Sequence, residues 1–425
     1  MNENVNKQKA RLYGGKQLWI IIFAGFMYLL TGSIAAGNTN TVLPYIAGLR
    51  GWLFPSMIIF VSLGGYVSVA ANLGFGQLLM KIGAKKVILI GLIGGGISAL
   101  LFGVTNNFAV FAITIILNFF FSGAYMAAGV NALLATWFPR KKGVIFGWST
   151  MGLVVASVTY APYVTKLFDK IGLGTTYIAI AIIFWILAVL CVFTIKDTPE
   201  EAGTYPDGDP NTDKEALAKV AMEFAQYKSP FTVGKLLKKK HTWQLMFGWG
   251  LPWFGMMAVF SQLVPRLIQV GYSANFASLV LAIAGFIALP GSWLFGWLDT
   301  KIGCKKSSII LGFVLLVGCV AAFLHPAGMF FVWLCAATMA LGQGAMANLV
   351  PSMIASWFGR WDFPAANRLL FPLVNIVATA GMTLVGVFLS HNIPFSTLYI
   401  VSAVVTAIGV IIMFTVKEEM IGKAG

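Results

Sequence analysis

The chain has 425 residues, of which 59% are hydrophobic and 10% are charged, and its formal net charge is +15. So few charges cannot cover the surface of a soluble protein of this length, which excludes a soluble globular enzyme and favours a membrane protein. The net charge suggests a nucleic-acid partner. If the chain crosses a membrane twelve times, as proposed below, nearly all Lys and Arg lie on one side of that membrane. The exceptions are Arg50, Lys166, Lys170 and Arg266. This asymmetry follows the positive-inside rule, so we expect no nucleic-acid partner.

Apolar runs long enough to cross a lipid bilayer follow one another along the chain. The basic segment 1–16 before the first run superficially suggests a signal peptide, but the run is too long and lacks a convincing cleavage site, so we expect a first helix. We therefore predict a multi-pass protein of the cell inner membrane with both termini in the cytoplasm. The twelve predicted spans are 17–47, 53–79, 87–105, 108–137, 143–165, 174–195, 243–267, 274–298, 307–324, 328–357, 364–390 and 394–416.

Two sequence motifs occur twice at the same offset of 220 residues. The segment 75–86 recurs as 295–306, and 135–140 recurs as 355–360. Two matches at one spacing indicate that the chain contains two copies of one helical unit, an arrangement that many transporters use to build a central site. The predicted organisation is an N-terminal six-helix bundle (1–195), a cytoplasmic linker (196–242) and a C-terminal six-helix bundle (243–425).

The linker is the one polar stretch between the two copies. Residues 197–210 are acidic and rich in turn formers, and 213–225 are expected to form a short surface helix. The linker holds too few apolar residues for an enzymatic domain, and the chain has neither a phosphate-binding loop motif nor a nucleophile–base set. We therefore predict no enzyme, no cofactor and no metal site. The four cysteines show no metal spacing and are expected to be apolar fillers or free thiols: Cys191, Cys304, Cys319 and Cys335.

The first repeated motif resembles the loop signature of the major facilitator superfamily, roughly G-x-L-x-D-R-x-G-R-K. Both copies keep the glycines and the basic cluster, but Met80 replaces the expected acid in the first copy and Asp299 is displaced by one position in the second. The resemblance implies an all-α membrane fold of twelve helices in two pseudo-symmetric bundles, monomeric in the bilayer, around one central site. The motif residues are Gly76, Lys81, Gly83, Lys85, Gly296, Asp299, Lys301, Gly303 and Lys305.

Shorter motifs resemble the branch that contains the oxalate/formate antiporter and bacterial monocarboxylate transporters. They lie at 123–143 in helix 4 and its following loop, at 199–208 in the linker, and at 350–359 at the end of helix 10. The resemblance implies a small organic anion as the substrate. Members that bind dicarboxylates place basic residues in helices 8 and 11, whereas 289–293 and Asn375 supply none. We therefore expect a monoanion, a zwitterion or a polar neutral solute rather than oxalate.

Arg368 stands within the predicted helix 11. It shares one helical stripe with Pro372, Asn375, Thr379 and Met382, at spacings of three and four residues. A charge at this depth normally faces a water-filled cavity or a partner, which predicts a positive vestibule that leads to a polar site. The alternative is that Arg368 extends to the membrane surface or pairs with Asp362.

The superfamily resemblance implies that helices 1, 4, 7, 10 and 11 line the central cavity. An aromatic and amide lining suits a small organic molecule with an apolar body. Each side chain taken alone is also compatible with ordinary helix packing. Arg50 and Arg266 are either anion-attracting groups at the outer mouth or ordinary loop charges. The predicted substrate-binding residues are Asn38, Thr41, Tyr45, Asn118, Ser122, Tyr125, Trp249, Trp253, Gln262, Gln343, Arg368, Asn375 and Thr379.

Every Asp and Glu is predicted to lie in a loop or a tail, and the three His residues at helix ends. Carriers driven by protons usually need a titratable group within the membrane, so we expect exchange, a proton carried with the substrate, or transport driven by the substrate gradient alone. The sequence predicts a secondary active or exchange transporter of a small organic anion, most simply a monocarboxylate. The alternatives are an efflux carrier for amphipathic or aromatic compounds and a membrane ligand sensor.

Overall fold

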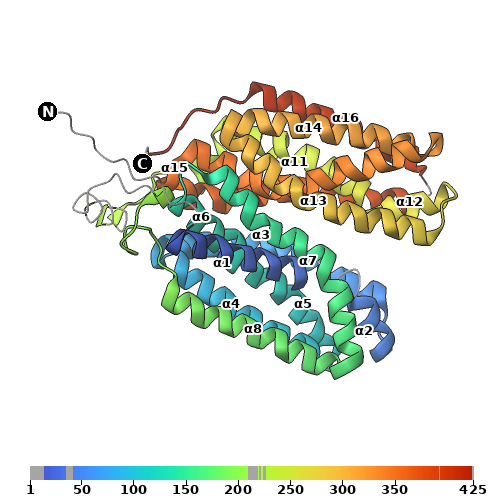
Figure 1. Ribbon diagram of the computed structural model, residues 1–425, viewed down its shortest axis with the longest axis horizontal. Helices are drawn as coiled ribbons and strands as arrows, with labels where there is room; N and C mark the ends of the chain where they lie inside the picture. Colours follow the sequence, from blue (N-terminus) through green and yellow to red (C-terminus); the bar gives the residue numbers. More distant parts are fainter. Residues whose placement is uncertain are drawn as a thin grey trace.

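The computed structural model describes residues 14–34, 42–208, 219, 222–223, 226–391 and 393–423. The described chain is helical, and its helices form two lobes that lie side by side with their long axes in the same general direction (Figure 1). The N-terminal half contains α1 (Gly15–Thr31), α2 (Leu43–Arg50), α3 (Phe54–Ile82), α4 (Ala84–Val104), α5 (Phe108–Ser122), the π-helix η2 (Gly123–Val130), α6 (Asn131–Trp137), α7 (Lys142–Ile171) and α8 (Leu173–Thr194).

The C-terminal half follows two short linker elements, η3 (Pro206–Gly208) and α10 (Val233–Leu237). It contains α11 (Lys240–Phe260), α12 (Leu263–Gln269), α13 (Ala274–Ile302), α14 (Cys304–Phe323), η4 (His325–Ala327), α15 (Met329–Ser390) and α16 (Phe395–Thr415). Most of the expected linker helix 213–225 lies outside the described residues.

Nine helices in the described ranges are long and apolar enough to cross a membrane, or ten if the bent pair α11–α12 is one span. The helix α15 is continuous except at Gly359, where φ is 61° and ψ is −177°, so it contains two of the predicted spans. The bent pair α11–α12 brings the nine helices to ten spans. Counting α15 as two spans and adding α7 for its apolar first part, Lys142–Ala156, gives the twelve spans of the predicted fold class.

The sequence repeat is also a structural repeat. The helices α3 and α13 begin and end 220 residues apart, and each ends at a glycine in the same unusual conformation. Gly83 has φ 88° and ψ 164°, and Gly303 has φ 89° and ψ 157°, values that favour glycine because it lacks a Cβ. The predicted loops between these helices and their successors are therefore single residues. As a result Asp299, predicted in a loop, lies in the last turn of α13.

The second motif supplies an equivalent tryptophan to each half. Trp137 and Trp357 are buried, and their indole nitrogens donate to the carbonyls of Lys196 and Lys417, at 3.1 and 2.9 Å. These carbonyls follow the last helix of each half, so each tryptophan fixes the chain as it leaves its bundle.

An acid after each last helix caps a helix of the same half. The Asp197 carboxylate accepts from the Lys85 backbone N–H at 2.6 Å, and the Glu418 carboxylate accepts from Cys304 and Lys305 at 2.9 and 3.0 Å. A carboxylate at a helix N-terminus satisfies free N–H groups and is favoured by the helix dipole. Burial raises the pKa of the Asp197 carboxyl, and the hydrogen bond from Lys85 opposes that shift.

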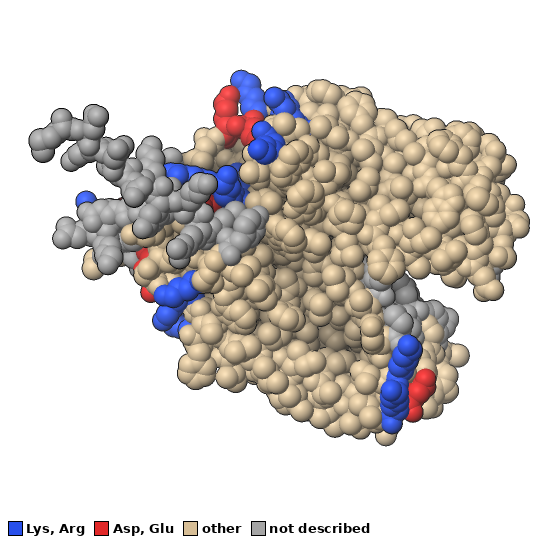
Figure 2. Space-filling model, viewed as in Figure 1, with Lys and Arg blue, Asp and Glu red and all other residues tan. Residues whose placement is uncertain are grey.

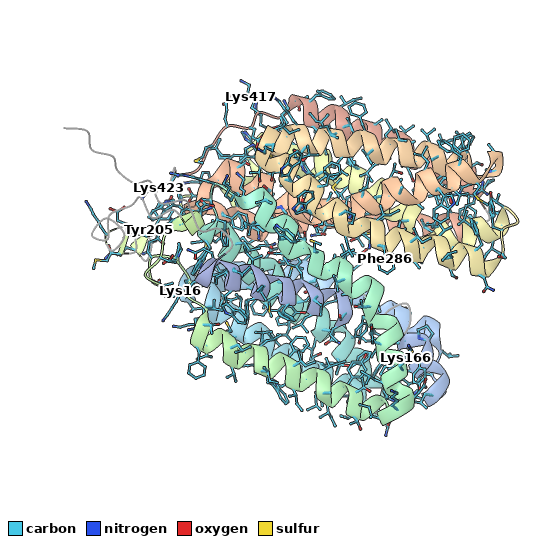
Figure 3. The ribbon with its side chains drawn as sticks, in the orientation of Figure 1. Lys16, Lys166, Tyr205, Phe286, Lys417 and Lys423 are labelled. Atoms are coloured by element: carbon cyan, nitrogen blue, oxygen red, sulfur yellow. The ribbon has the colours of Figure 1, made fainter. Side chains whose placement is uncertain are left out.

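Both ends of the described chain lie at one end of the lobes. Lys16 and Lys423 mark this end, which we call the terminal end, and Lys166 lies at the opposite end, which we call the far end (Figure 3). The two lobes are in contact towards the terminal end. At the far end a deep hollow separates them, which we call the notch (Figure 2). The four cysteines are buried and free, as expected.

Candidate functional site

The N-terminal and C-terminal halves meet closely where α7 crosses α13. Glycines allow the close approach, because a Cβ on Gly296 would lie 2.5 Å from the Gly143 carbonyl oxygen and 3.0 Å from the Gly147 Cα. The Thr150 and Ser292 hydroxyls are 2.6 Å apart, and Ser292 donates to the Gly147 carbonyl at 2.8 Å. All of these groups are buried, so this crossing closes the terminal end on one side of the molecule.

Asp299 lies at the terminal end of the same crossing. It is buried, accepts a hydrogen bond from Ser352, and lies against Gly143 in the first turn of α7. The adjacent Thr300 hydroxyl accepts from the Val144 backbone N–H at 3.1 Å. The C-terminal motif copy therefore places an acid and a hydroxyl at a helix N-terminus of the other half, where both are favoured.

A second crossing, of α3 with α15, is related to the first by the repeat. Gly76 of α3 touches Arg368 of α15 so closely that a Cβ on Gly76 would overlap the arginine Cβ. The neighbouring Asn367 donates to the Ala127 carbonyl of the other half at 3.0 Å. In α3 the position equivalent to Asp299 is the buried Leu79, so α3 brings no carboxylate to this place.

Arg368 does not pair with Asp362. Its Nε donates to the Ala365 carbonyl at 3.2 Å, and its side chain is 6% exposed. Asp362 is buried and accepts instead from the hydroxyls of Tyr227 and Ser229, at 3.0 and 2.5 Å. The bond to Ala365 turns the Arg368 side chain back by about one helical turn, towards the terminal end. Of the two forms of the alternative considered from the sequence, the structure excludes the pairing with Asp362.

The stripe on α15 that begins at Arg368 becomes more exposed towards the far end. Asn375 is half-buried, Thr379 is exposed, and Met382 is 51% exposed. Asn375 Nδ2 donates to the Phe371 carbonyl at 3.0 Å. Arg368 packs on α3 of the other half. The later residues of the stripe follow at helical spacing, so they lie on the same face of α15 as Arg368. Helical periodicity therefore extends the stripe from the closed crossing towards the far end, on the face of α15 that is turned to the N-terminal half.

Two large apolar side chains of the C-terminal half, Phe286 and Met382, are exposed. Phe286 of α13 is 61% exposed and points into the space between the lobes (Figure 3). The C-terminal half thus exposes Phe286 on α13, and the stripe on α15 ends with the apolar Met382.

In the N-terminal half, the predicted residues of helix 4 are buried within the bundle. The Tyr125 ring packs against Phe184 of α8 at 5.8 Å, and Ser122 donates to the Phe119 carbonyl at 2.8 Å. Asn118 is buried with no hydrogen-bond partner for Oδ1. Of the three, Asn118 therefore has spare capacity to bind a ligand. Asn38 and Thr41 lie outside the described residues.

Two polar residues of the N-terminal half were not singled out as site residues from the sequence. The Tyr28 hydroxyl donates to Asn131 Oδ1 at 2.6 Å, and both side chains are buried. Asn131 Nδ2 has no partner. Nothing in the sequence pattern distinguishes these residues from helix-packing residues.

In the C-terminal half, α11 has two predicted tryptophans with different environments. Trp249 donates to the Ser308 hydroxyl at 2.9 Å and packs against Trp357, which places it in the core rather than at the notch. Trp253, one turn further along the same face of α11, is buried with its indole N–H unpaired. Gln343 is half-buried on α15. Trp249 is thus occupied by core contacts, whereas the indole N–H of Trp253 is available to a ligand.

Four residues that the sequence analysis named lie near the far end. Tyr45 is exposed and its ring packs against Phe168 at 5.0 Å, while Gln262 lies at the α11–α12 junction and donates to the Ser261 hydroxyl at 3.4 Å. Arg50 donates to the Gly103 carbonyl at 2.9 Å and lies over the Trp52 ring. Arg266 lies over the rings of Phe395 and Tyr399, so both arginines are held by aromatic contacts.

The motif lysines have equivalent structural roles in the two halves. Lys85 Nζ donates to the Val192 carbonyl at 2.6 Å, and Lys305 Nζ donates to the Phe414 carbonyl at 3.0 Å. Each therefore ties the start of one helix to the C-terminus of its neighbour, where cations are favoured. Lys81 and Lys301 are exposed in the last turns of α3 and α13.

Comparison with known proteins agrees with this arrangement. The family model described as Major Facilitator Superfamily matches residues 21–333 and 263–423. The oxalate:formate antiporter of Oxalobacter formigenes is 22% identical over 283 residues, which cover 64% of this chain and 61% of the antiporter. The uncharacterized MFS-type transporter YhjX of Escherichia coli (strain K12) is 24% identical over 52% of each chain. The chain thus spans about half to three fifths of the length of these two relatives.

The sialic acid transporter NanX of Escherichia coli (strain K12) is 22% identical over 72% of this chain and 71% of that protein. Among solved structures, FucP in the outward conformation has a TM-score of 0.71 and 14% identity, covering 94% of this chain and 99% of FucP. The proton:xylose symporter XylE has a TM-score of 0.67 and 15% identity, over 95% and 97% of the two chains. The family match extends over both halves of the repeat, and the chain belongs to the major facilitator superfamily.

Proposed function

We propose that the protein is a secondary transporter that moves a small organic anion by alternating access. Two repeated bundles meet at glycine-rich crossings at one end and part at the other, which suits a pair of bodies that rock about a site between them. The observation that carries the anion proposal is Arg368, an arginine at the closed end of the stripe that extends along α15 towards the far end.

The basic residues favour an orientation in which the terminal end lies on the cytoplasmic side of the membrane. In this orientation the notch opens to the outside, and the protein is in an outward-facing state. The fold similarity to FucP in its outward conformation supports this assignment. We further propose that one chain is sufficient for function, because both halves of the site come from the same polypeptide.

A singly charged substrate fits the stripe better than a doubly charged one. Two of the similar proteins are named for oxalate, formate and sialic acid, all of which carry a carboxylate at neutral pH. The stripe offers one guanidinium at Arg368 and the amide of Asn375, whereas a buried dianion needs two compensating charges. A monocarboxylate is therefore the preferred substrate, bound with its carboxylate towards Arg368 and its apolar part towards the Met382 side.

The test is counterflow in proteoliposomes that contain the purified protein. Vesicles are loaded with one solute, and the uptake of labelled short monocarboxylates, oxalate, sialic acid, a neutral sugar and an aromatic acid is measured. We expect monocarboxylates to exchange fastest and uptake into empty vesicles to be slower. Uptake of the sugar alone, with no carboxylate transported, would show that the substrate is neutral and that Arg368 has another role.

A second candidate function is efflux of an amphipathic or aromatic compound. It is favoured by the apolar side chains of Phe286 and Met382, which are both more than half exposed. The same counterflow assay separates the two functions, since an efflux carrier would exchange the aromatic compounds and leave formate and acetate untouched.

A further inference from the structure

The last linker helix, α10, and the first turns of α11 form a fixed corner at the terminal end, which we call the α10–α11 corner (235–247). The Thr232 hydroxyl caps α10 by accepting from the Lys235 backbone N–H at 3.3 Å, and Leu236 is buried. The Thr242 hydroxyl donates to the Leu236 carbonyl at 2.6 Å. These contacts attach α10 to α11, so the backbone that carries the side chains of the corner is held in place.

Three lysines of the corner carry positive charge into the surroundings. Lys235, Lys238 and Lys240 are exposed, and none of them forms an ion pair with a carboxylate that the structure describes. Lys239, which lies between them in the sequence, is instead half-buried and lies over the Phe231 ring at 5.6 Å. Three neighbouring positive charges that the chain itself does not compensate favour an anion from outside it.

Two aromatic side chains continue the corner into the apolar part of α11. The Trp243 indole N–H donates to the Leu237 carbonyl at 2.9 Å, and the Trp243 ring stacks on Phe247 with a centroid distance of 6.3 Å. The two rings are 46% and 37% exposed, while other faces of α11 pack on α15 and α16. An exposed aromatic face at the start of a membrane-crossing helix meets lipid, and tryptophan favours the level of the headgroups. The three lysines therefore lie at the polar edge of the bilayer, beside the ring pair.

We propose that the α10–α11 corner binds one anionic phospholipid. Its phosphate lies among the three exposed lysines, and its acyl chains run along Trp243 and Phe247. Both parts of this ligand match the corner, since basic groups at a membrane surface attract anionic headgroups and aromatic rings pack on hydrocarbon. A free phosphate would use only the lysines and leave the rings without a role. The inference requires that α11 crosses a membrane, and it is independent of the proposed substrate.

The bound lipid joins the end of the linker to the second bundle at the membrane surface. Lys235 belongs to α10, whereas Lys240 is the first residue of α11, so one phosphate between them contacts both elements. A basic residue near the surface favours an anionic lipid over a zwitterionic one by about fivefold. Three lysines together are expected to favour it by about a hundredfold at low salt, and less as salt screens the charges.

Native mass spectrometry of the full chain measures this preference directly. The protein is reconstituted in nanodiscs of equal parts phosphatidylglycerol and phosphatidylcholine and released in the instrument, and the lipids that stay bound are identified and counted. The test variant carries Lys235→Gln, Lys238→Gln and Lys240→Gln together. We expect the wild-type protein to retain phosphatidylglycerol preferentially, and the ratio of retained phosphatidylglycerol to phosphatidylcholine to fall by about tenfold or more in the test variant.

The matched control removes three exposed lysines from other places at the terminal end, with Lys86→Gln, Lys141→Gln and Lys306→Gln together. It has the same net charge as the test variant and should keep the wild-type ratio. Trp243→Ala keeps all the lysines and removes part of the aromatic face, so it should lower the retention of phosphatidylglycerol. Each variant is first required to run as a monodisperse peak with a thermal transition.

The proposal is overturned if the folded test variant keeps the wild-type ratio of lipids. It is also overturned if the control variant loses the ratio to the same extent, because net charge rather than the corner would then attract the lipid. A parallel sample contains inorganic phosphate in detergent without lipid. Phosphate adducts that the test variant loses, with no lipid preference in the nanodiscs, would show a site for free phosphate and reject the phospholipid. No substrate is present, so a failure of the anion assay leaves this result unchanged.

Discussion

Arg368 carries a positive charge between the two halves, where its side chain touches Gly76 and its Nε donates to the Ala365 carbonyl. We propose that this charge attracts an anion from the notch towards the closed crossing. We predict that Arg368→Gln strongly lowers anion counterflow, and that Arg368→Lys restores part of it because the charge matters more than the fork geometry. Lys86→Gln, which removes an exposed charge at the terminal end, serves as the control. Normal counterflow by a folded Arg368→Gln protein would remove the residue from the mechanism.

Asn375 lies two turns from Arg368 on the same stripe and is half-buried. Its amide is able to donate to a carboxylate oxygen without adding charge, a bond worth about 1.5–3 kcal/mol. We predict that Asn375→Leu lowers the affinity for a monocarboxylate by about one to two powers of ten, measured by counterflow competition. Asn375→Lys should shift the preference towards a dicarboxylate, since it supplies the second cation. Unchanged affinities in both variants would show that this side chain does not touch the substrate.

At the scale of elements, close helix crossings at glycine determine where the two halves meet. Gly76 and Gly74 lie on the same helix, two residues apart. A Cβ on Gly76 would overlap Arg368, whereas a Cβ on Gly74 meets nothing within 4 Å. We predict that Gly76→Ala costs the closed state about 1–3 kcal/mol through overpacking and opens the terminal end. Gly74→Ala should behave as wild type. The distance between spin labels at Lys86 of α4 and Lys306 of α14, both exposed, provides the measurement. Equal distances in both alanine variants would contradict the prediction.

The two crossings differ in their polar groups. At the α7–α13 crossing, Asp299 and Thr300 meet the first turn of α7, whereas α3 has Leu79 and Met80 at the equivalent positions. A carboxylate near a helix N-terminus is stabilising, and only the first of these two positions supplies one. The linker contributes a further inter-half contact through Glu200, which belongs to neither crossing helix.

At the scale of the whole molecule, the described carboxylates gather towards the ends of the helices. Asp299 and Asp362 are buried within helices, contrary to the prediction that every acid lies in a loop, but both are tied to contacts at the terminal end. We therefore predict that exchange persists in substrate-loaded proteoliposomes when an ionophore collapses the pH gradient. An absolute need for an imposed proton gradient during exchange would require a titrating side chain that acts within the membrane.

The sequence by itself determined the class of protein and its internal symmetry. Hydropathy fixes the spans because the bilayer admits only chains whose backbone groups are paired within the helix. The 220-residue offset predicted equivalent elements, and the equivalent turns at Gly83 and Gly303 and the equivalent tryptophans at 137 and 357 agree with it. These features were predictable because they depend on local conformation and on composition.

Only the tertiary structure decided which side chains face one another. A helix position is compatible with several neighbours until the packing of the bundle selects one, which is why Trp249 lies in the core and Asp362 pairs with Tyr227 rather than with Arg368. The inter-half contacts Thr150–Ser292, Asn367–Ala127 and Glu200–Arg360 join residues 142, 240 and 160 positions apart. Contacts at such separations follow from how the two bundles dock, and neither periodicity nor the repeat specifies that docking.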